Sequence, residues 1–127
     1  MGRINLSDEA RRVLKEVIKH ILAEPKRVDM TSWVSRSDCG TVGCIAGWAW
    51  LVQYPEKKRI PKDCVVLDLF RNLLGLAESG SDVYRRVVYE AYWPAEFFHA
   101  LTKTNRGTRA YARVVASRIR YLLKTGI

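Results

Sequence analysis

The most uniform stretch of the chain is an apolar run from Val42 to Val52, which contains no charge, amide or hydroxyl group. Its large and small residues do not alternate with a period of two, so a half-exposed strand is disfavoured. A helix that is apolar on all sides is buried in a core or a membrane, and this run is much shorter than the roughly 20 residues of a membrane span. We therefore predict a buried central helix over about residues 41–53, which Thr41 caps and Tyr54-Pro55 ends.

The other predicted helices are amphipathic, with apolar residues that recur at spacings of three and four. Ser7 is a suitable N-cap for the first helix, and Gly75 is placed to end the third in a left-handed conformation. The segments that follow the pattern are about 8–23, 64–74, a stretch of about ten residues before Trp93, 94–102 and 108–124.

These segments predict an all-α or mainly α fold, with one compact domain over residues 1–127. About five or six helices would surround the buried central helix. A short two-stranded β element, with strands near residues 27–34 and 59–66, stays open as an addition, because Val28 and Met30 alternate with polar neighbours.

Cysteine content and the N-terminal sequence both favour an intracellular protein. The three cysteines are an odd number, which fits a reducing compartment better than a disulfide framework. The first residues lack the apolar segment of a signal peptide. We therefore expect a cytoplasmic location and no membrane association.

Positive charge is concentrated near the C-terminal end. The chain has a formal net charge of +9, and Glu96 is its last acidic residue. Residues 97–127 carry +7 of this charge on seven Lys and Arg side chains, among them Arg118. Such asymmetry indicates an anionic partner.

Four basic side chains of this region are spaced 4, 7 and 4 residues apart, so they would share one face of the last helix. They are Arg109, Arg113, Arg120 and Lys124, and Lys103 and Arg106 would extend them at the N-terminal end. Guanidinium groups stay charged and make bidentate contacts with phosphate. The sequence favours a non-enzymatic protein that binds an anionic partner here, with nucleic acid slightly preferred over an acidic protein surface. A merely solvated basic face is the third interpretation, and no helix-turn-helix, zinc-finger or RNP pattern decides between them.

A cysteine-dependent enzyme is a further alternative. Cys39 would lie just before or within the first turn of the predicted central helix, where the positive helix end lowers the pKa of a thiol. Such an enzyme also needs a base, and His20 and His99 are the two histidines of the chain. The sequence does not place either of them near Cys39.

Metal binding by Cys39, Cys44 and Cys64 is the last alternative. A structural zinc site needs four ligands, so a histidine would have to supply the fourth. The simpler interpretation is that Cys44 and Cys64 are small core residues, and we expect neither a metal nor another cofactor. The sequence also lacks a phosphate-binding loop, a nucleophile elbow, a His-Glu-x-x-His motif and a dinucleotide fingerprint.

Three stretches carry a resemblance. They are Asp29-Met30-x-x-Trp33 with Cys39-Gly40-Thr41-x-x-Cys44-Ile45-Ala46-Gly47-Trp48-Ala49, Leu73-Leu74-Gly75-Leu76 with Trp93-Pro94 downstream, and the helix that holds Arg118-Ile119. Together they resemble a group of small uncharacterised proteins from bacteria, phages and prophages. The resemblance implies an intracellular protein in a bacterial or phage-infected cell, and it implies no activity. In that setting, the alternative to nucleic-acid binding is an accessory protein that docks on an acidic surface of a host or defence protein.

Overall fold

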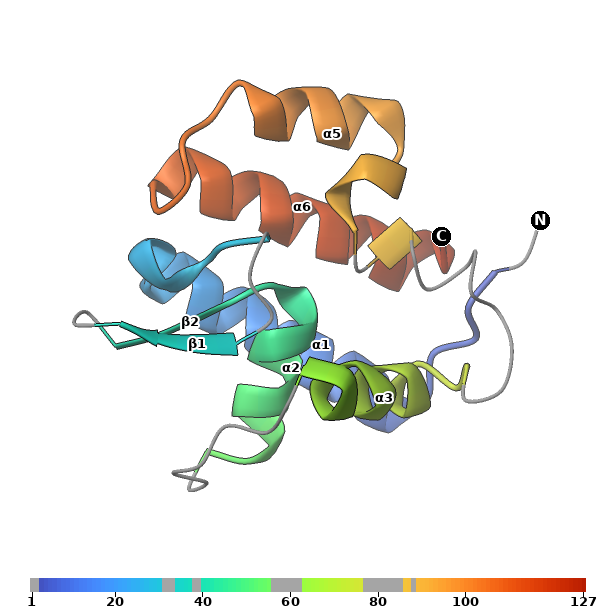
Figure 1. Ribbon diagram of the computed structural model, residues 1–127. Helices are drawn as coiled ribbons and strands as arrows, with labels where there is room; N and C mark the ends of the chain where they lie inside the picture. The colour runs from blue at the N-terminus through green and yellow to red at the C-terminus, as the bar shows by residue number, and fades with distance from the viewer. Residues whose placement is uncertain (1–2, 31–33, 38–39, 56–62, 77–85, 88) are drawn as a thin grey trace.

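The computed structural model describes residues 3–30, 34–37, 40–55, 63–76, 86–87 and 89–127 (Figure 1). As predicted, the chain forms a mainly helical, single compact domain. Its described α-helices are α1 (Asp8–Ala23), α2 (Ile45–Gln53), α3 (Asp63–Leu73), α5 (Ala95–Thr102) and α6 (Arg109–Thr125). Two short strands, β1 (Val34–Ser37) and β2 (Gly40–Gly43), and two 3₁₀ turns, Pro25–Arg27 and Glu90–Tyr92, complete the described elements.

The five described helices pack in an order that differs from their order in the chain. Figure 1 shows α5 lying along α6, with α1 on the other side of α6 and with α2 and α3 farther away. Each helix of the series α5, α6, α1, α2, α3 contacts the next. The C-terminal helix α6 is therefore held between α5 and α1, which leaves part of its surface for solvent.

Helix α1 follows the predicted boundaries because its capping and its apolar periodicity agree. The Ser7 hydroxyl accepts a hydrogen bond from the Ala10 N–H at 3.1 Å, which satisfies one of the free donors at the helix start. Val13, Leu14 and Val17 of its apolar face are fully buried, whereas Leu22 near the end of the helix is exposed. Helix α1 contacts both α2 and α6, so it links the two halves of the core.

The central helix was predicted to begin at Thr41, and this is wrong. Helix α2 begins at Ile45 with Cys44 as its N-cap residue, and residues 40–43 form strand β2, which pairs antiparallel with β1. Gly40 and Gly43 have low helix propensity, and the β-branched pair between them favours the extended backbone that the partner strand stabilises. The predicted burial is confirmed for residues 45–50, whereas Leu51, Val52 and Gln53 are half-buried. The helix ends at Gln53, just before Tyr54, as predicted.

A two-stranded β element is present, but not where the sequence suggested it. β1 pairs with β2 in the register Val34↔Gly43 and Ser37↔Gly40. The predicted partner segment 59–66 cannot be a strand over its described part, because residues 63–66 belong to α3. Its other residues, 59–62, lie outside the described part of the chain.

Helices α3, α5 and α6 begin and end close to the predicted positions. Gly75 has a φ of 77°, and the Leu76 and Gly75 N–H groups donate to the carbonyls of Arg71 and Asn72, which is the hydrogen-bond pattern of a glycine-terminated helix. At the start of α6 the Thr108 hydroxyl accepts from the Tyr111 N–H at 3.2 Å. The helix predicted before Trp93 falls largely outside the described residues, and its last part, Glu90–Tyr92, is a 3₁₀ turn.

The N-terminal segment is tied to the end of α6. The Ile4 N–H donates to the Gly126 carbonyl at 2.7 Å, and the Ile4 side chain is buried in the core. None of the helices in the described part of the chain is both long enough and apolar enough to cross a lipid bilayer.

Candidate functional site

The predicted basic residues of α6 share one exposed face of that helix. We call this set the basic face; its members are Arg109, Arg113, Arg120 and Lys124, and all four are exposed. The buried side chains of the helix, which include Val115, Ile119 and Leu122, lie on the opposite side. Packing against α1 and α5 therefore leaves the basic face to solvent.

The basic face differs from the other charged surfaces in how its charge is compensated. Four cations elsewhere in the described part of the chain pair with a carboxylate three residues earlier: the N···O distances are 2.7 Å for Arg12–Glu9, 3.2 Å for Lys19–Glu16, 2.7 Å for Arg27–Glu24 and 3.7 Å for Arg71–Asp68. Helix α6 contains no acidic residue. Within the described residues, no carboxylate forms an ion pair with any member of the basic face.

The two further predicted residues, Lys103 and Arg106, precede α6 and are also exposed. Arg106 differs from the basic face because its guanidinium lies 3.6 Å from the Asp29 carboxylate. The Arg106 side chain is still 62% exposed, whereas Asp29 is 20% exposed. The positive charge of Arg106 is therefore partly compensated, and Arg106 is not counted as a member of the basic face.

Arg118 is one of the seven basic side chains of residues 97–127, but it does not belong to the exposed charge of this region. The side chain is fully buried on the side of α6 that faces the core. Its Nη2 donates to the main-chain oxygens of Arg86 at 2.6 Å and Ile127 at 2.7 Å. Burial lowers its pKa to about 10, so Arg118 remains a cation at neutral pH.

Aromatic rings surround this buried cation. The guanidinium carbon lies 6.0 Å from the ring centre of Trp93 and 5.9 Å from those of Phe97 and Tyr121, within the range of cation–π contacts. The helical spacing could have revealed its position, because Arg118 lies three residues after Val115 and four before Leu122. Both neighbours are core residues.

An apolar groove runs between α5 and α6, beside the basic face. It has a volume of about 330 Å³ and is lined by Glu96, Phe97, Ala100, Arg113, Val114 and Ser117. Arg113 therefore belongs both to the groove and to the basic face. The groove combines apolar walls with three polar groups, namely a carboxylate, a guanidinium and a hydroxyl.

The cysteines do not form the predicted constellations in the described part of the chain. Cys44 is buried, and burial raises the pKa of its thiol to about 11, so it is neutral at physiological pH. Cys39 lies outside the described residues. Because α2 begins only at Ile45, the prediction that the start of this helix lowers the pKa of the Cys39 thiol is wrong. Cys64 is the second residue of α3. Among the described residues, no group of three His, Cys, Asp or Glu side chains is arranged to hold a metal ion.

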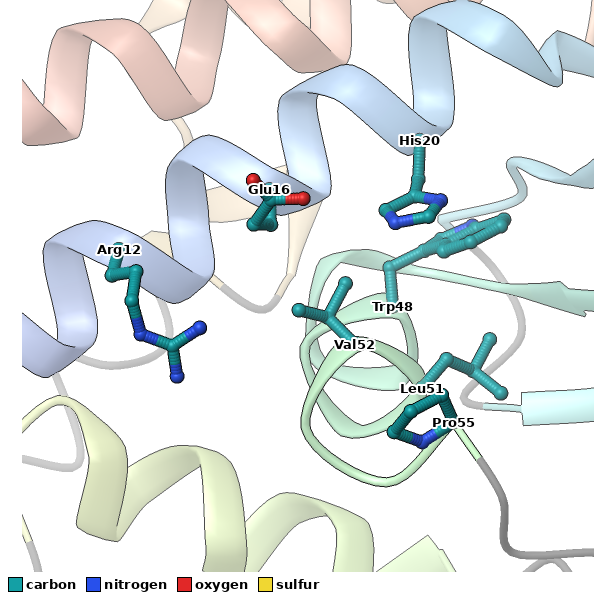
Figure 2. A pocket seen from close by; sticks show the side chains of 7 residues that line it. All are labelled: Arg12, Glu16, His20, Trp48, Leu51, Val52 and Pro55. Atoms are coloured by element: carbon teal, nitrogen blue, oxygen red, sulfur yellow. The ribbon is translucent and has the colours of Figure 1, made fainter.

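The two histidines lie on helices that are far apart in the packing order. His99 is exposed on α5. His20, on α1, stacks on Trp48 of α2 with 5.8 Å between the ring centres (Figure 2). The stack lies in a pocket of about 270 Å³ between the two helices, which is also lined by Arg12, Glu16, Leu51, Val52 and Pro55.

Trp48 fixes one end of this second pocket. Its Nε1–H donates to the Arg27 main-chain oxygen at 3.0 Å, and the Arg27 guanidinium lies 5.2 Å from its ring centre. Because the indole is almost fully buried and its donor is satisfied, we assign Trp48 a packing role.

No family model, curated protein or solved structure matches this chain. The geometry and charge of the surface therefore carry the functional information, above all at the basic face and the adjoining groove.

Proposed function

We propose that this chain is a non-enzymatic binding protein whose basic face engages the phosphates of a nucleic acid. The observation that supports this most is the combination of four exposed cations on one helix face with the absence of any acid from that helix. Exposed helices gain stability from pairs of opposite charge, so a single-sign face suggests a partner that supplies the anions.

The dimensions of the basic face suit a polyanion better than a small anion. Arg109 and Lys124 are separated by about 22 Å along the helix axis, since each residue advances the helix by about 1.5 Å. Phosphates of one DNA strand follow one another at about 3.4 Å along the duplex axis. Several phosphates could therefore be contacted at once, and the three arginines can each make bidentate contacts.

Such contacts position a nucleic acid without reading its sequence, because they involve only the backbone. Binding should then weaken steeply with salt. With four phosphates neutralised, counterion release predicts that affinity falls about 50- to 150-fold between about 50 and 200 mM salt.

A fluorescence-anisotropy titration with mixed-sequence DNA and RNA, in single- and double-stranded form, tests this proposal at both salt concentrations. The test variant is Arg109→Glu with Arg113→Glu, which should abolish binding while the protein stays folded. The matched control is Lys15→Glu with Lys26→Glu, which changes the net charge equally on exposed residues that form no ion pair within the described part of the chain. Binding that survives in the α6 variant, or that falls equally in the control, would refute a specific role of the basic face.

An acidic protein surface remains the second candidate partner, in line with a phage-type accessory protein. The apolar groove beside Arg113 favours it, because protein interfaces combine apolar contacts with a charged rim. A protein partner that copurifies after nuclease treatment, and that is lost in the Arg109→Glu, Arg113→Glu variant, would support this candidate over nucleic acid.

A further inference from the structure

We infer that the nucleic acid is single-stranded and that one unpaired base enters the groove between α5 and α6. This inference rests on the proposed function and names the class of nucleic acid that it concerns. It follows from the position of the groove, from the chemistry of its walls and from the placement of its two charged groups.

The groove and the basic face are continuous through Arg113. This arginine lines the groove together with Val114 and Ser117 of the same helix, and α5 supplies the opposite wall. A strand whose phosphates follow the basic face would therefore pass the mouth of the groove. A phosphate held at Arg113 would bring the base of that nucleotide within reach of the groove.

The walls of the groove suit the flat, apolar faces of a nucleobase. Phe97, Ala100 and Val114 provide the apolar surface, and the groove volume of about 330 Å³ can accommodate one base. The Phe97 ring is held by its neighbours, since its centre lies 5.3 Å from that of Tyr121 and 5.9 Å from the Arg118 guanidinium carbon. A ring that is already fixed loses little freedom when a base stacks on it.

The two charged groups indicate which part of a nucleotide lies where. Glu96 would repel a phosphate, but its carboxylate can accept hydrogen bonds from the exocyclic amines of bases. Arg113 attracts phosphate instead. We therefore place the base toward Glu96 and the backbone toward Arg113, and the Ser117 hydroxyl can bond either the base edge or the backbone.

A duplex cannot use the groove without breaking a base pair, because its bases are stacked and paired inside the helix. Stacking of one base on an aromatic side chain strengthens binding by about 5- to 150-fold. Single strands should therefore bind at least about fivefold more tightly than the same sequence as a duplex.

The test uses fluorescence anisotropy with a labelled strand of about 12 nucleotides, its duplex, and an abasic strand of the same length. Ala100→Phe fills the groove from α5, and Ala95→Phe is the matched control, since both alanines are exposed on α5 and only Ala100 lines the groove. We expect Ala100→Phe to weaken single-strand binding about tenfold and to leave duplex binding unchanged. Ala95→Phe should change neither, and the abasic strand should bind no better than the duplex.

The outcomes separate this inference from the function on which it rests. Equal affinity for strand and duplex, or an unchanged single-strand affinity in Ala100→Phe, would overturn the inference while the basic face could still bind both forms. An abasic strand that binds as tightly as the normal strand would also overturn it, without any variant. If no oligonucleotide binds at about 50 mM salt, the proposed function fails first.

Discussion

Arg118 shows how a charged side chain can serve as a core residue. No Asp or Glu among the described residues forms an ion pair with it, and its Nε and Nη1 are buried without a hydrogen-bond acceptor there. Two main-chain oxygens and three aromatic rings stabilise the guanidinium instead. Because one of those oxygens belongs to Arg86 and the other to Ile127, the side chain joins two segments that are distant in sequence.

Replacing Arg118 should affect stability, not binding. We expect Arg118→Ala to lower the free energy of unfolding by about 2–5 kcal/mol, since it leaves a cavity and two main-chain oxygens without their donor. Arg120→Ala, two residues away on the basic face, should leave stability nearly unchanged and weaken nucleic-acid binding. Urea denaturation and anisotropy of both variants measure the two effects. A reduced salt dependence of binding in Arg118→Ala, with stability unchanged, would contradict the assignment.

Tyr111 should make stability depend on alkaline pH. Its hydroxyl accepts a hydrogen bond from the Met30 N–H at 2.9 Å, and burial raises its pKa from 10.0 to about 12. Because the pKa of the folded state lies above that of the unfolded chain, this stabilisation is complete below pH 10 and is lost as the pH rises toward 12.

Tyr111→Phe tests both parts of this argument. At neutral pH the variant should be about 1–2 kcal/mol less stable than the wild type, because the buried Met30 N–H loses its acceptor. Between pH 10 and 12 the difference should narrow, since only the wild type loses the contribution of the phenol. Urea denaturation across this range measures it, with the exposed Tyr92→Phe as control. A difference that stays constant or widens would show that Tyr111 does not titrate as argued.

At the scale of the elements, two glycines end helices in the left-handed conformation, and their surroundings differ. Gly75, after α3, has a φ of 77° with no heavy atom within 4 Å of the position that a Cβ would take. Gly126, after α6, has a φ of 73°, and its Cβ would lie 2.7 Å from the Ile4 oxygen. Both glycines are therefore needed for their backbone conformation, but only Gly126 is also needed for the close approach of the Ile4 backbone.

The pair Gly75→Ala and Gly126→Ala separates these two requirements. Gly75→Ala should lower the free energy of unfolding by about 1–2 kcal/mol through backbone conformation alone. Gly126→Ala should lower it further, because the new methyl group disturbs the contact of Ile4 with the end of α6. Urea denaturation compares them directly. Equal losses would mean that the N-terminal segment can move aside without penalty.

Strong apolar periodicity and local caps made several elements predictable from the sequence. Helices α1, α3 and α6 begin and end within one or two residues of their predicted positions. The start of α2 was not predictable in this way, because a run that is apolar throughout has no period that would separate strand from helix. The exposure of the basic face was correctly predicted, whereas the groove was not foreseen, since it depends on how α5 packs against α6.

At the scale of the whole molecule, the charge is unevenly compensated. The net charge is +9, yet the ion pairs between described residues involve α1, α3, the turn at Pro25–Arg27 and the pair Arg106–Asp29, and none reaches the basic face. Like charges on adjacent turns of a helix repel one another. Helix α6 must therefore be held by its buried side, through its packing against α1 and α5.

If the basic face serves binding, it should reduce the stability of the free protein. Arg113→Glu places a carboxylate four residues after Arg109, in the N-terminal part of α6, where the helix dipole favours negative charge. The free energy of unfolding should therefore stay unchanged or rise by about 0.3–0.5 kcal/mol. The same variant should weaken nucleic-acid binding. Added salt screens the repulsion between the basic side chains, so it should raise the melting temperature of the wild type more than that of the variant.

Thermal melts of the two proteins at low and high salt, together with anisotropy titrations, measure this trade-off. Ala110→Ser, at a position that is also exposed on α6 but lies outside the groove lining, does not change the charge and controls for substitution as such. If Arg113→Glu lowered the free energy of unfolding by about 2 kcal/mol or more, as a core substitution does, Arg113 would support the packing of α5 on α6. The basic face would then have a structural reason to carry that arginine, and the case for an anionic partner would rest on Arg109, Arg120 and Lys124 alone.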